Sequence, residues 1–207
     1  MNLKTDACHH LLQDTRRLVA FMFILMTLSG CVVAINATEA GPQSAAAHSP
    51  SAGSPPTVIY LVRHAEKETT SSDPELSVQG KRRAAALNRF LANEPIDVLL
   101  SSDYRRTKAT LKPLALRHNL DIKIYDAGNP AALVAKVLDQ YAGKRMVIAG
   151  HSNTVPDLAG RFQSSGELNF VTRADLDHDE YERIFVVIIP GQGSATLLEL
   201  AYPGIGP

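Results

Sequence analysis

The chain has 207 residues, 45% of them hydrophobic and 20% charged, a composition that is typical of a globular protein with a single core. Its 21 Lys and Arg balance its 21 Asp and Glu, so it lacks the broad basic surface that a general nucleic-acid-binding protein needs. Its two cysteines, Cys8 and Cys31, are too few for a disulfide-rich scaffold or a thiolate zinc site.

The first residues have the pattern of a targeting segment. An apolar run at Leu18–Leu28 follows three basic residues, Lys4, Arg16 and Arg17. Its 11 residues match the apolar region of a signal peptide and are too few to span a membrane. The run leads directly into Leu28-Ser-Gly-Cys31. This arrangement predicts that the chain is exported.

The tetrapeptide that ends at Cys31 resembles the lipobox of bacterial lipoproteins, in which the cysteine is lipidated and becomes the mature N-terminus. The resemblance implies a lipoprotein signal peptide over residues 1–30 and a membrane anchor at Cys31. Two alternatives stay open, an uncleaved anchor over Leu18–Ile35 and ordinary secretory cleavage near residues 37–40. All three export the domain, and the lipoprotein reading places it in the cell envelope, lipid-anchored and facing the periplasm or the cell exterior.

A linker follows the targeting segment. Ala, Ser, Pro and Gly fill 16 of the 21 positions from Asn36 to Pro56, and Glu39 is the one formal charge. Such a segment buries too little apolar surface to offset the entropy of ordering it. We therefore expect residues 31–56 to form a lipidated N-terminus and a flexible tether of about 25 Å. A folded domain is expected over residues 57–207.

Strands alternate with helices along the first part of this domain. A buried strand is predicted first, because Val58–Val62 is a short apolar run with β-branched residues. Ser77 is then the expected N-cap of a helix over Lys81–Leu91. On this helix Lys81, Arg82 and Arg83 would form a polar face, from which one of them could reach toward a substrate. Next come a strand, a helix that Pro113 is expected to kink, and a third strand, over Ile96–Leu100, Tyr104–His118 and Ile122–Tyr125.

The alternation continues to the C-terminal part of the chain. The expected helices are Pro130–Tyr141 and Val155–Phe162, and the expected strands are Arg145–Ala149, Ile184–Ile189 and Ala195–Leu200. This order predicts an α/β fold, a three-layer sandwich in which helices cover both faces of a mostly parallel central sheet. In such sheets ligands bind at the carboxyl ends of the strands.

Residues suited to phosphate chemistry follow three of the predicted strands. They are Arg63-His-Ala-Glu66, the segment from Ser101-Ser102 to Arg105-Arg106, and Gly150-His-Ser-Asn153. Because parallel strands end at one edge, two arginines and two histidines are expected to converge there. An arginine binds phosphate oxygens with two parallel hydrogen bonds, and a histidine nitrogen can attack phosphorus to form a covalent intermediate that water later opens.

These motifs resemble those of the histidine phosphatase superfamily, the phosphoglycerate-mutase-like proteins. They are Leu61-Val-Arg-His-Ala-Glu66, Ser101-Ser-x-x-x-Arg106-Thr, Gly150-His-Ser-Asn-Thr154 and the turn motif Leu76-Ser-x-x-Gly80. They occur in the order that the family has, and the resemblance covers Thr57 to Tyr202. It implies a histidine phosphatase domain with a phosphoglycerate-mutase-like fold.

The resemblance also implies roles for individual residues. His64 would be the nucleophile that becomes phosphohistidine, and Arg63 and Arg106 would hold the phosphoryl oxygens. His151 would donate to the phosphoryl group, and Asn153 would lie in the substrate pocket. Transfer would then depend on positioning and positive charge, with no metal and no cofactor.

The second arginine and the general acid need to be assigned separately within the family pattern. Arg106, not Arg105, corresponds to the family's second arginine, because it precedes the small residue Thr107. The mutases carry their general acid, a Glu, in an insertion after the second helix, whereas the short stretch from Leu120 to Pro130 contains no Glu. Glu66 is the candidate acid nearest in sequence, followed by Asp157, and an ion pair between Glu66 and a pocket arginine is the alternative.

The sequence therefore predicts a phosphatase that hydrolyses phosphate monoesters or phosphohistidine through a covalent intermediate on His64. Its partner would be a small phosphorylated substrate or a phosphoprotein. It would reach the membrane through the lipid anchor and would bind no nucleic acid.

A binding module with little turnover is the alternative, because the chain has no obvious general acid. A phosphoglycerate mutase is disfavoured by export and by the missing insertion. A zinc deaminase, which His64-Ala-Glu66 would also fit, is excluded because the chain has no C-x-x-C.

Overall fold

The computed structural model describes residues 53–69, 71–164 and 174–202. The expected signal peptide, Cys31 and the linker up to residue 52 lie outside these described residues. None of the helices in the described ranges is both long and apolar enough to cross a membrane.

The observed elements follow the predicted order. They are β1 (Thr57–Arg63), α2 (Val78–Phe90), β2 (Val98–Ser102), α3 (Arg105–His118), β3 (Ile122–Tyr125), α4 (Pro130–Gln140), β4 (Arg145–Gly150), α5 (Thr154–Gln163), β5 (Arg183–Ile189) and β6 (Thr196–Ala201). Ser101 and Ser102 still belong to β2, since they pair with Ile124 and Tyr125 of β3. Helix α3 continues through Pro113.

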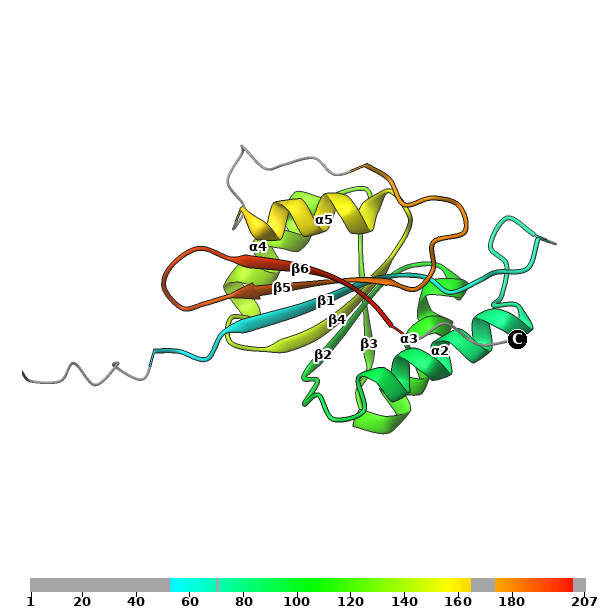
Figure 1. The fold of residues 1–207 in the computed structure, drawn as a ribbon, viewed down its shortest axis with the longest axis horizontal. Coiled ribbons are helices and arrows are strands. Elements are labelled where there is room, and N and C mark those ends of the chain that lie inside the picture. The colour runs from blue at the N-terminus through cyan, green and yellow to red at the C-terminus, as the bar shows by residue number, and fades with distance from the viewer. Residues whose placement is uncertain (1–52, 70, 165–173, 203–207) are drawn as a thin grey trace, which may run out of the picture. The chain divides into compact units, whose positions relative to one another are not determined.

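The six strands form one sheet in the order β3-β2-β4-β1-β5-β6 (Figure 1). β3, β2, β4 and β1 are parallel, whereas β5 runs antiparallel to β1 and pairs with β6 in a hairpin. This arrangement confirms the predicted α/β fold with a mostly parallel sheet. The central strands β2, β4 and β1 end side by side.

Helices cover both faces of the sheet because side chains alternate along each buried strand. On β1, Ile59 and Leu61 pack in the cluster that includes the apolar residues of α4 and α5. Val58, Tyr60 and Val62 pack in the cluster that includes those of α2 and α3. The predicted three-layer sandwich is therefore confirmed, with all seven residues of β1 buried between the helix layers.

The start of α2 lies against the chain that leaves β1. Ser77 caps the helix by accepting a hydrogen bond from the Gly80 N–H at 3.1 Å, as predicted. The Ser77 N–H donates to the Glu66 carbonyl at 3.0 Å. A Cβ atom at Gly80 would lie 2.0 Å from the same carbonyl oxygen. Position 80 therefore needs glycine for space, because the helix approaches the backbone two residues after His64.

We expect Gly80→Ala to lower the free energy of unfolding by roughly 2–4 kcal/mol, because the contact is with backbone atoms that cannot move aside cheaply. Urea denaturation would measure the loss. Gln79→Ala, at the exposed neighbouring position of the same helix, is the control and should change stability by less than about 0.5 kcal/mol. Equal unfolding midpoints for Gly80→Ala and the wild type would contradict the close approach.

Candidate active site

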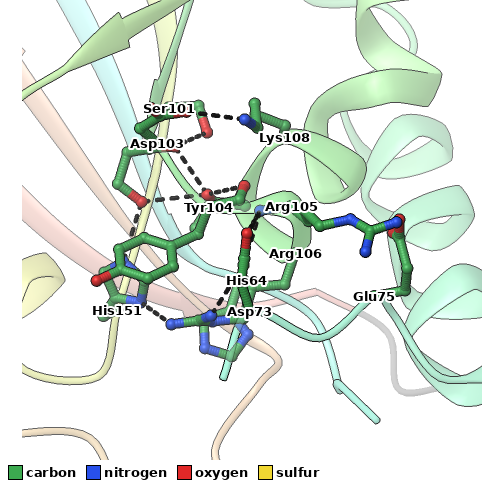
Figure 2. Close-up of polar contacts among 12 residues, drawn as sticks. His64, Asp73, Glu75, Ser101, Asp103, Tyr104, Arg105, Arg106, Lys108 and His151 are labelled. Carbon is green, nitrogen blue, oxygen red and sulfur yellow. Dashed lines mark hydrogen bonds and ion pairs between the residues drawn. The ribbon is translucent and has the colours of Figure 1, made fainter. Parts of the chain in front are cut away.

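The carboxyl ends of the central strands bring His64, Arg106 and His151 together (Figure 2). The backbone N–H of His64 donates to the Gly150 carbonyl at 2.9 Å. This bond continues the pairing of β1 with β4 and places His64 beside His151. Their ring centroids are 5.5 Å apart in an edge-on arrangement. Arg106, from the first turn of α3, donates from Nη2 to His151 Nδ1 at 3.5 Å.

His64 is held as a neutral ring with one nitrogen available for attack. Its Nδ1 lies 2.8 Å from the Ala65 carbonyl oxygen. Because a carbonyl only accepts, Nδ1 carries the hydrogen and Nε2 keeps its lone pair. Burial, and then the charges of Arg106 and Arg63, lower the pKa of His64 to about 3, although the hydrogen bond to Ala65 opposes the shift. The ring is therefore neutral at neutral pH, and its Nε2 has the lone pair that a nucleophile needs.

The orientation of His151 is set by a chain of hydrogen bonds. Since Arg106 donates to Nδ1, the hydrogen of the neutral ring is on Nε2, which donates to Ser102 Oγ at 2.9 Å. Ser102 Oγ donates to Thr107 Oγ1 at 3.1 Å, and that hydroxyl donates to the carbonyls of Ser102 and Tyr104. Ser102 and Thr107 are fully buried. Burial, followed by the charge of Arg106, lowers the pKa of His151 to about 4.

Arg63 connects the site to the segment 174–182. It is only 4% exposed, and its Nη1 donates to three backbone carbonyls at 2.8–3.2 Å, those of Asp177, His178 and Glu180. Its guanidinium lies 4.2 Å from the centre of the Tyr181 ring, which is itself 6.2 Å from the ring of His64. Tyr181 therefore forms one wall beside the predicted nucleophile. The sequence contained no motif that pointed to it.

The two neighbouring arginines of α3 point in different directions (Figure 2). Arg106 lies over the Tyr104 ring at 4.3 Å, with its Nη1 3.5 Å from Asp73 Oδ1. Arg105 forms an ion pair with Glu75 away from the histidines, and its side chain is 58% exposed. Asp73 also accepts from the Arg105 N–H at the start of α3. Of the two arginines, Arg106 is the one that lies beside His151.

The arrangement is suited to a phosphoryl group. The Nε atoms of Arg63 and Arg106 are buried and have no hydrogen-bond partner among the described residues. A buried donor without a partner costs on the order of 1–3 kcal/mol, and an anion that accepts from it removes this cost. Two guanidinium groups beside a neutral histidine with a free Nε2 can hold a phosphoryl group while the histidine attacks it.

Comparisons with known proteins bear on this site. Residues 59–127 match the model of the histidine phosphatase superfamily (branch 1). The chain is 38% identical over 71 residues to phosphoserine phosphatase 1 of Hydrogenobacter thermophilus, a match that covers 31% of this chain and 34% of that protein. The chain thus spans about a third of the length of this curated relative.

Solved structures show the same fold. One is a candidate phosphohistidine phosphatase SixA from Nakamurella multipartitia, with a TM-score of 0.53, 20% identity and coverage of 72% of this chain and 98% of that one. Another is mycobacterial glucosyl-3-phosphoglycerate phosphatase, with a TM-score of 0.51, 14% identity and coverage of 71% and 98%.

These findings support the predicted similarity of the chain to the histidine phosphatase superfamily. The segment matched to the superfamily includes Arg63, His64, Glu66 and Arg106, whereas His151 and Asn153 lie beyond it. His151 is connected to the matched part by the structure, through the contacts with Ser102 and Arg106.

Glu66 lies in a buried ion pair with Arg83. Its Oε1 is 2.7 Å from Arg83 Nε and 2.6 Å from Arg83 Nη2. Of the two alternatives for Glu66, the structure shows the ion pair, and the role of general acid stays a prediction. The expected position of Arg83 on a polar helix face is wrong, because this residue is only 6% exposed. The contact depends on how α2 packs beside β1, which spacing along the chain does not determine.

Asn153 and Asp157 belong to the start of α5. Asn153 precedes α5, is exposed and makes no side-chain capping bond. Asp157 pairs with Arg161 at 2.9 Å within the same helix. Over residues 53–69, 71–164 and 174–202, no group of three or more His, Cys, Asp and Glu side chains is arranged to hold a metal ion. The described cluster thus consists of two histidines and two arginines with their supporting hydroxyl groups.

We expect the stability of the fold to fall in mild acid. The pKa values of His64 and His151, about 3 and about 4, lie below the ordinary value of 6.5, so the unfolded chain binds more protons between these limits. The stability that the neutral rings contribute is complete above pH 6.5 and is lost as the pH falls through about 4 for His151 and about 3 for His64. Urea denaturation across this range should show the decline.

The matched variant for this measurement is His151→Gln, which removes one of the two titrating rings. Its unfolding free energy should decline less steeply between pH 6.5 and about 4 than that of the wild type. Parallel declines in the two proteins would show that burial of His151 does not couple folding to pH.

Proposed function

We propose that the chain is a phosphatase of the histidine phosphatase superfamily, which hydrolyses phosphate monoesters or phosphohistidine through a phosphohistidine on His64. The observation that carries this proposal is the state of His64. Its Nδ1–H is bound to the Ala65 carbonyl, so a neutral Nε2 is left for attack. The superfamily match and the convergence of Arg63, Arg106 and His151 support the same conclusion.

The proposed reaction has two displacements at phosphorus. His64 Nε2 first forms a bond to phosphorus while the bond to the leaving group breaks, and Arg63 and Arg106 stabilise the charge on the phosphoryl oxygens. Water then attacks the same phosphorus, the P–N bond breaks, and inorganic phosphate leaves with His64 restored. His151 is predicted to donate to the phosphoryl group, and its Nε2–H, which is bound to Ser102 in the structure, is the hydrogen that it would donate.

The leaving group needs a proton, and Glu66 stays the candidate acid. In the structure its Oε1 is bound to Arg83, and its buried Oε2 has no hydrogen-bond partner among the described residues, so Oε2 is the oxygen that would carry the proton. The relatives include proteins named as a candidate phosphohistidine phosphatase and a phosphoserine phosphatase, so both phosphohistidine and phosphate esters belong to the proposed substrates. If turnover is slow on every ester, the same pocket would act as a binding module for phosphorylated ligands.

The test offers the purified full chain an aryl phosphate, phosphoserine and a phosphohistidine peptide, and measures the release of phosphate. Rapid acid-free quenching and mass spectrometry should find a phosphoryl group on His64, labile in acid and stable in base. Phosphate release from at least one compound, together with this label, is the expected result. Binding of phosphate without release or label on any compound would support the binding module and overturn the enzyme.

We further propose that this domain, residues 57–207, is exported as a lipoprotein, with residues 1–30 removed, Cys31 lipidated and residues 31–56 as a tether. The apolar run and the lipobox-like sequence support this proposal. Metabolic labelling with an alkyne fatty acid in a bacterial host tests it. Label should be present in the wild type and in Cys8→Ser, and absent from Cys31→Ser. Label retained in Cys31→Ser would overturn the anchor assignment.

A further inference from the structure

A cavity of about 450 Å³ adjoins the phosphate-binding residues, at the carboxyl ends of β2 and β3. It is lined by Asp103 and Tyr104, which follow β2, and by residues 124–128 at the end of β3 and in the loop before α4. Cavities of this size hold small organic ligands. The cavity is therefore large enough for the part of a substrate that lies beyond its phosphoryl group.

Tyr104 is shared between the cavity and the active site. Tyr104 lines the cavity. Its ring is nearly perpendicular to the His151 ring, with the two centroids 4.9 Å apart, and the centre of its ring lies 4.3 Å from the Arg106 guanidinium. Figure 2 shows Tyr104 beside His151 and Arg106. A substrate with its phosphoryl group at these residues can therefore extend past Tyr104 into the cavity.

The walls combine apolar surface with carboxylates. Tyr104 and Ile124 are 40% and 45% exposed, so both offer apolar surface to a ligand in the cavity. Tyr125 also lines the cavity; it is buried, and its hydroxyl donates to the Ala149 carbonyl at 3.3 Å. The charged lining residues are Asp103 and Asp126, and no Lys or Arg lines this cavity.

The two carboxylates differ in how they are held. Asp126 accepts the Gly128 N–H on Oδ1 at 2.8 Å, which orients the carboxylate at the cavity wall. Asp103 forms an exposed ion pair with Lys108 at 2.8 Å, so part of its charge is compensated there.

The phosphate end of the site carries the cations Arg63 and Arg106, whereas the cavity end carries carboxylates. This polarity matches a ligand that is anionic at one end and cationic at the other.

We propose that the cavity is the leaving-group subsite of the enzyme and that it binds the ammonium end of a phosphate monoester of a small amino alcohol. The inference rests on the proposed phosphatase function. Asp126 supplies the main opposing charge, Asp103 adds to it at the rim, and the side chains of Tyr104 and Ile124 contact the carbon skeleton. Carboxylates and aromatic rings are together the groups that bind ammonium ions in proteins.

The test compares two esters of the same shape, phosphocholine and 3,3-dimethylbutyl phosphate, in which a neutral carbon replaces the ammonium nitrogen. We expect kcat/KM of the full chain to favour phosphocholine by about fivefold or more, since partly exposed charge pairs each contribute roughly a factor of two to five. High salt should reduce this ratio, because it screens exposed charges.

Asp126→Asn is the decisive variant, because an asparagine can still accept the Gly128 N–H and keep the turn. It should bring the ratio for the two esters close to one. Asp121→Asn is the matched control, an exposed aspartate that precedes β3 at its opposite end, and it should leave the ratio unchanged. A ratio that persists in Asp126→Asn would overturn the assignment of Asp126.

Failure of this inference can be distinguished from failure of the phosphatase function. If the wild type hydrolyses both esters equally, prefers the neutral one, or hydrolyses only an aryl phosphate or phosphohistidine, the amino-alcohol subsite is refuted and the phosphatase stands. If no phosphorylated compound is hydrolysed and His64 takes no label, the proposed function fails and the subsite fails with it.

Discussion

Replacing His64 with asparagine is expected to lower kcat on every hydrolysed compound by about 10⁴-fold or more, the range seen when a covalent nucleophile is removed. Asparagine can still donate an N–H to the Ala65 carbonyl, so it keeps the local hydrogen bond and removes only the nitrogen that attacks phosphorus. Initial rates of phosphate release, with the phosphoryl label on the protein as a second measurement, would show the loss.

The control for this variant is His118→Asn. His118 ends α3, at the opposite end of the helix from Arg106, and should be dispensable for turnover. Circular dichroism and urea denaturation would establish that His64→Asn is folded. A folded His64→Asn protein with more than about a tenth of wild-type kcat would contradict a covalent mechanism at this residue.

Arg106→Met is expected to lower kcat/KM by about 10²–10³-fold, the range for removing one group that stabilises charge in a transition state. Arg106 contributes to the site in two ways: its charge faces both histidines, and its Nη2 donates to His151 Nδ1. Methionine preserves much of the side-chain volume but neither the charge nor the donor. Steady-state kinetics on the best compound of the panel would measure the change.

Arg105→Met is the matched control, because it changes the neighbouring residue in the same way. Arg105 pairs with Glu75 and is largely exposed, so its loss should alter kcat/KM by less than about threefold, as for other exposed ion pairs. Equal losses in the two variants would mean that general positive charge at the start of α3, and not the position of Arg106, promotes the reaction.

The strands and helices could be predicted because burial determines where apolar residues occur along the chain, as continuous runs in buried strands and at helical spacing in helices. The apolar runs in β1, β2 and β4 are continuous because these parallel strands are covered on both faces. The four residues His64, Arg63, Arg106 and His151 were identified from short motifs. Parallel strands with the carboxyl ends at one edge then bring these motifs close together in the structure.

Other parts of the site depended on contacts between distant segments. Arg83 meets Glu66 because the first turns of α2 pack against the backbone after β1, through the space that Gly80 leaves. Tyr181 lies beside His64 because Arg63 binds the carbonyls of a segment more than a hundred residues later. No local pattern encodes either contact.

By itself, the sequence determined the alternation of strands and helices, the motif residues and the expectation of export, because propensity, burial period and motif spacing are local properties. The tertiary structure decided which nitrogen of His64 is free, that Ser102 and Thr107 orient His151, and that a cavity lined by two aspartates adjoins Tyr104 beside Arg106. Those features arise from the distances and directions between side chains on different elements. Packing of the whole domain sets them.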